Sequence, residues 1–474
     1  MAEPEYQELL AENRRLLEEN QRLVAENERL RKRVEALEAQ VRRLTEALQN
    51  SQRAEKRQAA PFSKRPPSAN PKRPGRKPGE QYGPKAHREA PPHIDEVYDA
   101  PLPDACPNCG GTLEETAVVS QYQTEIPRQP IYREFHIHLG ICPNCGQCHQ
   151  GRHELQTSDA LGAAAAQLGP EAQAAAVVLN KQAGLSYGKI VQIFQDLFGI
   201  RVSRGGLAQA VLRTAQRCQQ AYENIRVAVS QSPTVTPDET GWRVGGVLNW
   251  LHVLVGTTAT CFQIDKHRGA EVAAGVLGWD YSGVLTHDGW ASYDRFEQAM
   301  HQQCVAHALR RARELRDAAH GRGVEFPQQI IRLLQDGLEC RDLYRAGLVL
   351  PEGLDAAAVE FAEELHALTS RPRSNPDQAR FAKHLSNHLW DWFTFLLLPE
   401  ADATNFRAEQ ALRGPIVNRK VWGGNRTDNG AEAQSILSSV LATCRQQAQP
   451  VLDFFSQTLR GLCPPLFRTD GSGR

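Results

Sequence analysis

The stretch SPTVTPDETGWRVGGVLNWLHVLVGTTATCFQID, residues 232–265, consists of β-branched and aromatic runs separated by glycines. Such runs are typical of consecutive strands in a sheet meander. Downstream, residues 270–278 (AEVAAGVLG) predict a helix, and residues 282–290 (SGVLTHDGW) predict a further strand. This part of the chain therefore predicts a sheet domain of the α/β class that begins near residue 233.

Three carboxylates stand where such a domain could present them. Asp238 is predicted to close the first strand and Asp288 a later one, each before a turn with Gly and Trp, while Glu409 lies in the helical sequence TNFRAEQALR with Arg407 and Arg413 nearby to meet phosphates. Metal-assisted phosphoryl transfer needs carboxylates at fixed points that hold two divalent ions, with phosphate oxygens completing the shell. An Asp at a strand end is also a common turn-forming residue, and that alternative stays open.

Helices are predicted on both sides of these strands. Residues 159–230 are Ala-rich and amphipathic, with a break at Gly199 and Ser203 as the N-cap of the following helix. This segment fits a helix–turn–helix DNA-binding unit and an ordinary helical hairpin equally well. The chain from His301 to about residue 400 is predicted to be mostly helical, with the apolar run 390–398 as a buried helix, and residues 432–462 predict one or two helices.

The first fifty residues predict a coiled coil. Leucine recurs every seventh residue, at Leu9, Leu16, Leu23, Leu30, Leu37 and Leu44. The accompanying seam is Asn13, Asn20, Asn27, Val34, Val41 and Leu48. Leu at heptad position d with Val or Asn at position a favours a parallel two-stranded coil, in which buried Asn fixes the register. A single solvated helix would leave the leucine seam in water, and a basic-zipper regulator would need a basic helix where only MAEPEYQE precedes the coil.

A basic, proline-rich segment follows at residues 53–100. Proline opposes helix and central strand, so an extended arm is expected. The piece KRPGRKPG, residues 72–79, could track DNA phosphates or lie in a minor groove. A merely solubilising linker is the alternative.

Two CPNC motifs predict a structural zinc site with Cys106, Cys109, Cys142 and Cys145 as ligands. Each motif is followed by Gly, which permits a tight turn around a metal. Cys148, His149 and His153 lie just beyond the second motif and could replace a ligand or simply lie near it. Two matched pairs favour zinc over a redox-active Cys-x-x-Cys.

Composition sets outer limits. The chain has 474 residues, 41% of them hydrophobic, and a formal net charge of zero, so the total charge does not itself indicate nucleic acid. There is no apolar stretch of about 18 residues and no apolar leader after the charged N-terminus, so neither a membrane span nor export is expected. Clustered cysteines without an export signal favour metal binding in a bacterial-type cytosol.

Several motifs, in order, resemble those of the insertion sequence 66 family of bacterial transposases. They are DETGWRVGGVLNWLHV, LTHDGWASYDRF, HQQCVAHALRRARELRD, ATNFRAEQALR and VNRKVWGGNRTDNGAEAQSILSSVLATCRQQ. The order of coil, KPG-rich arm, paired CPNC finger and catalytic domain is also similar. The resemblance implies a DDE transposase with an RNase H-like core split by a helical insertion between the second Asp and the Glu. It implies Asp238, Asp288 and Glu409 as the catalytic triad. Glu432 is a reserve candidate for the third carboxylate, and Glu239 and Asp280 are reserve candidates for the other two.

Other residues have two open interpretations. Cys304 and His307 form a Cys-x-x-His that either supports the active site or packs in the core. The arginines 310, 311 and 313 either bind DNA phosphates or form a solvated helix face. In the stretch 419–426, the basic residues could hold the DNA backbone while Trp422 stacks on a base; a core position for Trp422 is the alternative.

Together these features predict a multidomain α/β protein. The predicted segments are a coiled coil 1–52, a basic linker 53–100, a zinc finger 101–155, a helical domain 156–232, a catalytic core 233–300, a helical insertion 301–400, a second core part with C-terminal helices 401–462, and a tail 463–474.

The predicted activity is DNA strand cleavage and strand transfer at insertion-sequence ends, with two Mg²⁺ (or Mn²⁺) ions and structural Zn²⁺ as cofactors. The expected partners are transposon-end and target DNA, a second copy or a higher oligomer through the coil, and accessory proteins of the element, with no membrane; the expected location is the cytoplasm, at the nucleoid. The alternative function is a catalytically inactive, transposase-derived DNA-binding protein or regulator.

Overall fold

The computed structural model describes residues 90–467, apart from 125, 127, 128, 163–166 and 463, and five single residues between positions 15 and 34. The predicted coiled coil, as an assembly, and residues 53–89 of the basic linker lie outside the described residues. The chain divides into two compact units, Met1–Glu125 and Ile126–Arg474. Of the first unit, the five single residues are helical, and residues 90–124 contain turns but no helix or strand.

The second unit contains a five-stranded mixed sheet. Its strands are β3 (Thr234–Val244), β4 (Val247–Val255), β5 (Thr260–Asp265), β6 (Val284–His287) and β7 (Met300–Gln303). The order across the sheet is β5-β4-β3-β6-β7; β4 is antiparallel to β3 and β5, whereas β6 and β7 run parallel to β3. The four strands predicted between residues 232 and 290 are thus confirmed. A short hairpin, β1 (Leu139–Ile141) with β2 (Cys148–Gln150), precedes this sheet in the chain.

Strand β7 is an element that the sequence did not predict, because the chain from His301 was expected to be helical. Its sequence, MHQQ, has four residues and no β-branched side chain. The strand forms because Met300–Gln303 pairs in register with the whole of β6. Tertiary pairing therefore overrides the local signal.

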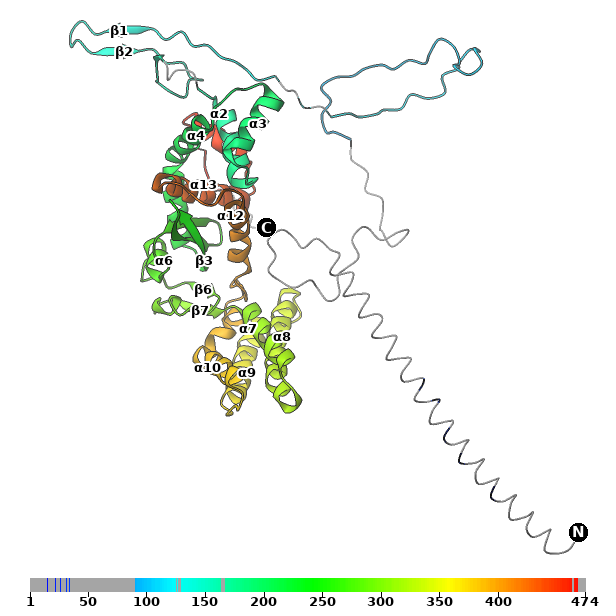
Figure 1. The fold of residues 1–474 in the computed structure, drawn as a ribbon, viewed down its shortest axis with the longest axis vertical. Coiled ribbons are helices and arrows are strands. Elements are labelled where there is room, and N and C mark those ends of the chain that lie inside the picture. The colour runs from blue at the N-terminus through cyan, green and yellow to red at the C-terminus, as the bar shows by residue number, and fades with distance from the viewer. Residues whose placement is uncertain are drawn as a thin grey trace, which may run out of the picture. The chain divides into compact units, whose positions relative to one another are not determined.

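The sheet is covered on both faces. The side chains of Leu251 and Val253 on β4 pack in one apolar cluster with Leu412 of α12, whereas Leu254 belongs to a second cluster with Ile225 of α5 and Ala273 of α6. The three helices named are α5 (Gln219–Ser230), α6 (Ala270–Leu277) and α12 (Phe406–Trp422). Two further helices follow α12 in the chain, α13 (Asp428–Gln446) and α14 (Val451–Leu459). Figure 1 shows α6 and α12 on either side of the sheet, with α13 lying along it.

A helical segment precedes the sheet. It comprises α2 (Pro170–Val177), a π-helical turn (Val178–Gln182), α3 (Tyr187–Phe198) and α4 (Arg204–Arg217). Gly199 ends α3 at a positive φ of 67°, which a residue without Cβ adopts at little cost, and the Ser203 hydroxyl accepts a hydrogen bond from the Gly206 N–H at 3.0 Å. The predicted break at Gly199 and cap at Ser203 are therefore confirmed.

A second helical segment lies between β7 and α12 and has its own apolar core. It comprises α7 (Val305–Ala318), α8 (Glu325–Arg345), α9 (Pro351–Thr369), α10 (Pro376–Asn387) and α11 (Thr394–Leu397), with short 3₁₀ turns at Gly321–Val324 and Leu389–Trp392; another 3₁₀ turn, Tyr293–Arg295, precedes β7. The expectation of one buried helix over 390–398 is wrong in part. The run is broken at Phe393, and Trp390 is 61% exposed although Phe395 is fully buried.

The molecule is thus mixed α/β with a helical majority, as the strand pattern indicated for its class. Among the helices described, none combines the length and apolar character that crossing a bilayer requires. The finer domain boundaries given above remain predictions.

Candidate active site

Asp238 lies on the central strand, but not where it was expected. It is the fifth of eleven residues of β3, so the prediction that it closes the strand is wrong. The strand continues to Val244 because TGWRV pairs with the start of β4 across the Gly245–Gly246 turn. However, β3 pairs with β6 only at Thr234 and Val235. Asp238 therefore lies just beyond the point at which these two parallel strands separate.

Asp288 follows β6 directly, as predicted. Its side chain is exposed, and it accepts a hydrogen bond from the Trp290 N–H at 3.1 Å. The next residue, Gly289, has a φ of 88°, in the region that favours glycine. The turn therefore directs the Asp288 carboxylate outward at the carboxyl end of β6.

Glu409 lies in the first turn of α12, so its predicted helical position is confirmed. Its N–H donates to the Asn405 carbonyl at 3.1 Å. Its carboxylate is half-buried, and Oε1 lies 3.7 Å from Nε2 of His307 on α7. The two helices thus bring a histidine beside the third candidate carboxylate.

The charges of Asp288 and Glu409 act on the Asp238 carboxyl group. The pKa of Asp238 is raised to about 7, mainly by burial and also by the charges of Asp288, Glu239 and Glu409, against one hydrogen bond from the Glu239 N–H. Residues from three separate elements are therefore brought into one electrostatic neighbourhood. Within the described ranges, however, no three His, Cys, Asp or Glu side chains are grouped so that they could hold a metal ion by themselves.

The reserve candidate Glu239 has a different setting. Its Oε1 accepts hydrogen bonds from Arg268 at 2.9 Å and its Oε2 from the Tyr293 hydroxyl at 2.9 Å, and its side chain is 4% exposed. The guanidinium of Arg268 lies between the rings of Trp250 and Trp290, 4.7 and 4.3 Å from their centroids. Glu239 is thus fixed in an ion pair and is less available to a metal than Asp238.

The other two reserve candidates are exposed. Asp280 precedes β6, whereas Asp288 follows it, so a strand of four residues, about 13 Å, separates them. Glu432 lies in α13, on the far side of the loop that follows α12. Neither position favours a place among the three carboxylates.

Cys304 and Asn405 join the two ends of the helical segment that separates β7 from α12. The Cys304 thiol donates to Oδ1 of Asn405 at 3.1 Å, and the Asn405 N–H donates to the Cys304 sulfur at 3.4 Å. The Val305 N–H donates to the Ala403 carbonyl at 3.0 Å. Cys304 is buried, in line with the packing interpretation, but it also fixes the residue at which the Glu409 helix begins.

His307 does not follow the packing interpretation. Its Nε2 faces Glu409, and its buried Nδ1 has no hydrogen-bond partner within the part of the chain that is described. The supporting interpretation of the Cys-x-x-His is therefore the better description of His307.

Sequence reasoning missed a histidine pair beneath the Asp288 turn, in which His287 is buried and His301 is partly buried. The Gly289 N–H donates to Nδ1 of His287, which leaves the proton of His287 on Nε2, facing Nδ1 of His301 at 3.0 Å. His301 in turn faces the Phe296 carbonyl through Nε2 at 3.1 Å. Burial lowers the pKa of His287 to about 3, so its ring is neutral. The available signal was the histidine that precedes Asp288 at an inward position of LTHDGW.

The basic and aromatic residues that were considered as DNA contacts lie in different environments. Arg407 donates to the Gly256 carbonyl at 2.8 Å and lies 3.6 Å from Asp402, so it is held by the protein. Arg413 is exposed, as are the arginines 310, 311 and 313 of α7. Trp422 packs edge-on against Trp242 with centroids 6.0 Å apart, which favours the core interpretation over base stacking.

The two CPNC motifs adopt matching turns. In the first, the Gly110 N–H donates to the Cys106 carbonyl, and in the second the Gly146 N–H donates to that of Cys142, each at 2.8 Å. Both glycines have positive φ, 76° and 69°. Hydrogen bonds from the motif's own backbone lower the pKa of the Cys106 and Cys142 thiols, which favours the thiolate that zinc requires. The motifs lie in different units, and a shared zinc site remains a prediction.

Residues 165–433, more than half of the chain, match the family model described as "Transposase IS66 family". This match includes the whole sheet and all three candidate carboxylates. The class of protein is therefore that of the transposases, which are DNA-processing enzymes. Within that class, the chain belongs to the IS66 family. No curated protein is similar enough to count as a match.

Proposed function

We propose that this protein is a DDE transposase that cuts and joins DNA strands at the ends of its element, with Asp238, Asp288 and Glu409 as the catalytic carboxylates. The observation that carries the proposal is that the charges of Asp288 and Glu409, which lie 50 and 171 positions from Asp238 along the chain, both act on the Asp238 carboxyl group. Each comes from a different element of one sheet-and-helix core, as a rigid catalytic scaffold requires.

We also propose that the core is RNase H-like and is split by the helical segment between β7 and α12. The supporting observation is the topology. A central first strand carries an antiparallel hairpin extension on one side and two parallel strands on the other, and the third carboxylate follows on a helix packed against the first strand.

The donor set fits divalent magnesium. Carboxylate oxygens are hard ligands, and Mg²⁺ usually takes one or two of them together with water and substrate phosphate. The raised pKa of Asp238 reflects burial first and then the negative charge of its neighbours, and a bound cation would offset both. When bound, the metal would activate the attacking oxygen and stabilise the leaving oxygen of the phosphodiester.

The remaining chemistry belongs to the chain's own residues. Asp238 and Asp288 would hold cations where β3 and β6 separate, and Glu409 would approach from α12. His307, 3.7 Å from Glu409, would orient that carboxylate. Water oxygen would attack the scissile phosphorus and the 3′-oxygen would leave with a proton; the freed 3′-hydroxyl would then attack target DNA, displacing another 3′-oxygen. Structural zinc at the CPNC motifs and pairing through residues 1–52 complete the proposal.

Cleavage of authentic element ends tests the proposal. Single substitutions Asp238→Ala, Asp288→Ala and Glu409→Ala should each reduce magnesium-dependent cleavage by at least about a hundredfold, and Asp280→Ala, an exposed carboxylate outside the group, should not. Full activity in any of the three removes that residue from the mechanism. A wild-type protein that binds these ends but never cleaves them would instead support the inactive, DNA-binding alternative.

A further inference from the structure

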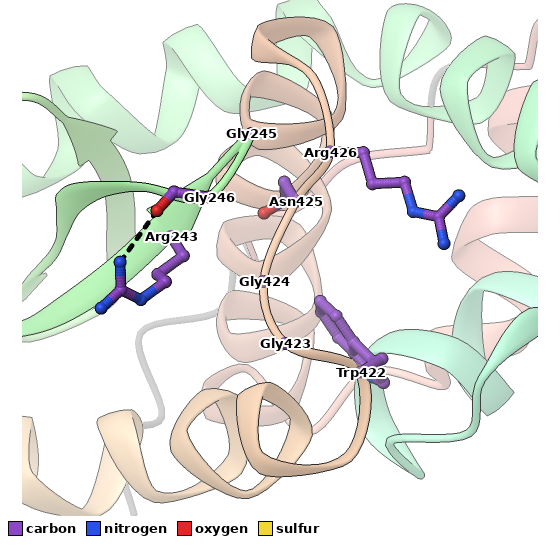
Figure 2. Close-up of a pocket in the computed structure, with 8 residues that line it drawn as sticks. All are labelled: Arg243, Gly245, Gly246, Trp422, Gly423, Gly424, Asn425 and Arg426. Carbon is purple, nitrogen blue, oxygen red and sulfur yellow. Dashed lines mark hydrogen bonds between the residues drawn. The ribbon is translucent and has the colours of Figure 1, made fainter.

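A cavity of about 210 Å³ lies between the β3–β4 turn and the loop that joins α12 to α13. It is lined by Arg243, Gly245 and Gly246 on one side and by residues 422–426, sequence WGGNR, on the other. Figure 2 shows the two segments side by side. No acidic residue lines the cavity, so its polar surface consists of backbone groups, Asn425 and two arginines.

The two segments hold one another rigidly. The Gly245 N–H donates to the Asn425 carbonyl, and the Asn425 N–H donates to the Arg243 carbonyl, each at 2.9 Å. The Trp242 indole N–H donates to Oδ1 of Asn425 at 2.8 Å. A Cβ on Gly424, which has a φ of 110°, would lie 2.4 Å from the Arg243 carbonyl oxygen. The close approach therefore depends on glycine, and the cavity exists before any ligand binds.

The cavity offers hydrogen-bond donors. In the part of the chain that the structure describes, the backbone N–H groups of Gly246, Gly424 and Arg426 donate to no protein acceptor, and neither Arg243 nor Arg426 forms an ion pair. These three N–H groups are not consecutive, because the N–H groups of Gly245 and Asn425 bond between the two segments, so each is a single donor beside the two positive charges. Both arginine side chains are exposed, although Arg243 also donates to the Gly246 carbonyl at 2.8 Å.

The directions of the two arginine side chains indicate which kind of anion the cavity could bind. Figure 2 shows the Arg243 and Arg426 side chains leaving the loop on opposite sides. One phosphate cannot contact both guanidinium groups in this arrangement. A chain of phosphates that crosses the loop would meet one arginine before the cavity and the other after it, which is the charge pattern of a nucleic-acid strand.

Strand β3 and helix α12 both run from the candidate carboxylates to the cavity, so they set the distance between the two sites. From Asp238 to Arg243 along β3 is five residues, about 17 Å. From Glu409 to Trp422 along α12 is thirteen residues, about 20 Å. Between them, Nη1 of Arg419 lies 3.5 Å from the Thr240 hydroxyl. We propose that this cavity binds the phosphodiester backbone of the DNA held at the carboxylates, about five or six nucleotides from the scissile phosphate at ~3.4 Å per step.

The inference rests on the proposed function, and the test separates the two. Full-length Arg243→Gln/Arg426→Gln protein is titrated with a duplex of about 30 base pairs of arbitrary sequence over a range of salt. The matched control is Arg332→Gln/Arg345→Gln, which removes two exposed arginines from α8. Loss of two phosphate contacts should make the negative slope of log affinity against log salt concentration shallower by about 1.8. It should also weaken binding on the order of tenfold. The control should match wild type.

A photocrosslinking residue provides a second readout that does not depend on the arginines. Placed at Val247, which is 66% exposed beside the cavity, it should crosslink to the duplex; placed at Leu348, which is 73% exposed in the α8–α9 loop, it should not. Slope and affinity equal to the control, or equal crosslinking at both positions, would overturn the inference.

Asp238→Asn is assayed for cleavage in parallel. If it cleaves normally, the proposed function fails and the binding series still decides the cavity. If it is inert while the double variant binds and cleaves like wild type, only the cavity assignment fails.

Discussion

Replacing Asp238 with Asn should stabilise the metal-free protein while it abolishes cleavage. The difference between an ordinary pKa of 3.8 and about 7 in the folded protein corresponds to about 4 kcal/mol at ~1.36 kcal/mol per pKa unit. A buried acid with a raised pKa binds its proton more tightly when the protein is folded than when it is unfolded. The free energy of unfolding therefore falls as pH rises from about 4 to about 7, and the full cost is present above pH 7.

Asn resembles the protonated acid and keeps the oxygen that accepts from the Glu239 N–H. We therefore expect the melting temperature of Asp238→Asn, in chelator at about pH 8, to exceed that of wild type by on the order of 5 °C. The gap should fall to less than half near pH 5 and close below about pH 4, where Asp238 is protonated in both the folded and the unfolded wild type. At pH 8 it should narrow when Mg²⁺ is added, because binding stabilises only the wild type.

Thermal melts of the two proteins at both pH values measure this, with Asp280→Asn as an exposed control that should melt within about 1 °C of wild type. An equal melting temperature at pH 8, or a gap that persists unchanged at pH 5, would refute the reasoning from burial and neighbouring charge.

Three further predictions concern other parts of the chain. Wild-type protein should contain one tightly bound zinc by elemental analysis, and Cys109→Ser should lose it; equal zinc in both proteins would remove Cys109 from the ligand set. Deleting residues 1–52 should convert a dimer into a monomer by light scattering, whereas an unchanged mass would place the interface elsewhere. Asn405→Ala should destabilise the protein by about 1–3 kcal/mol, because Asn405 is buried and its partner Cys304 loses an acceptor, and it should reduce cleavage more than Glu432→Ala does.

The sheet's longer strands were predictable because their sequences carry the signal themselves. VLNWLHVLV is apolar on both faces, and the glycines that bound it mark turns, so β4 was found where it lies. The four residues of β7, three of them polar, carry no such signal, and their strand conformation depends on pairing with β6. The position of a residue within its strand could not be predicted from the neighbouring sequence either. Asp238 was placed at a strand end because a Gly follows soon after, but the pairing with β4 carries β3 past that glycine.

The candidate site shows the same division. The residue types and the resemblance identified Asp238, Asp288 and Glu409, and the structure adds the groups that orient them. His307 could be singled out from its spacing to Cys304, yet its proximity to Glu409 depends on how α7 and α12 pack. The contact between His287 and His301 depends on the parallel register of β6 with β7, which local sequence does not encode.

The hydrogen bonds between Cys304 and Asn405 hold the two ends of the intervening hundred-residue segment next to each other. The entropic cost of closing such a loop grows only with the logarithm of its length, so each doubling adds about 0.6 kcal/mol. A change in the length of this segment should therefore leave the helix that carries Glu409 in place. For protein engineering, the same junction is the natural place to graft a foreign domain.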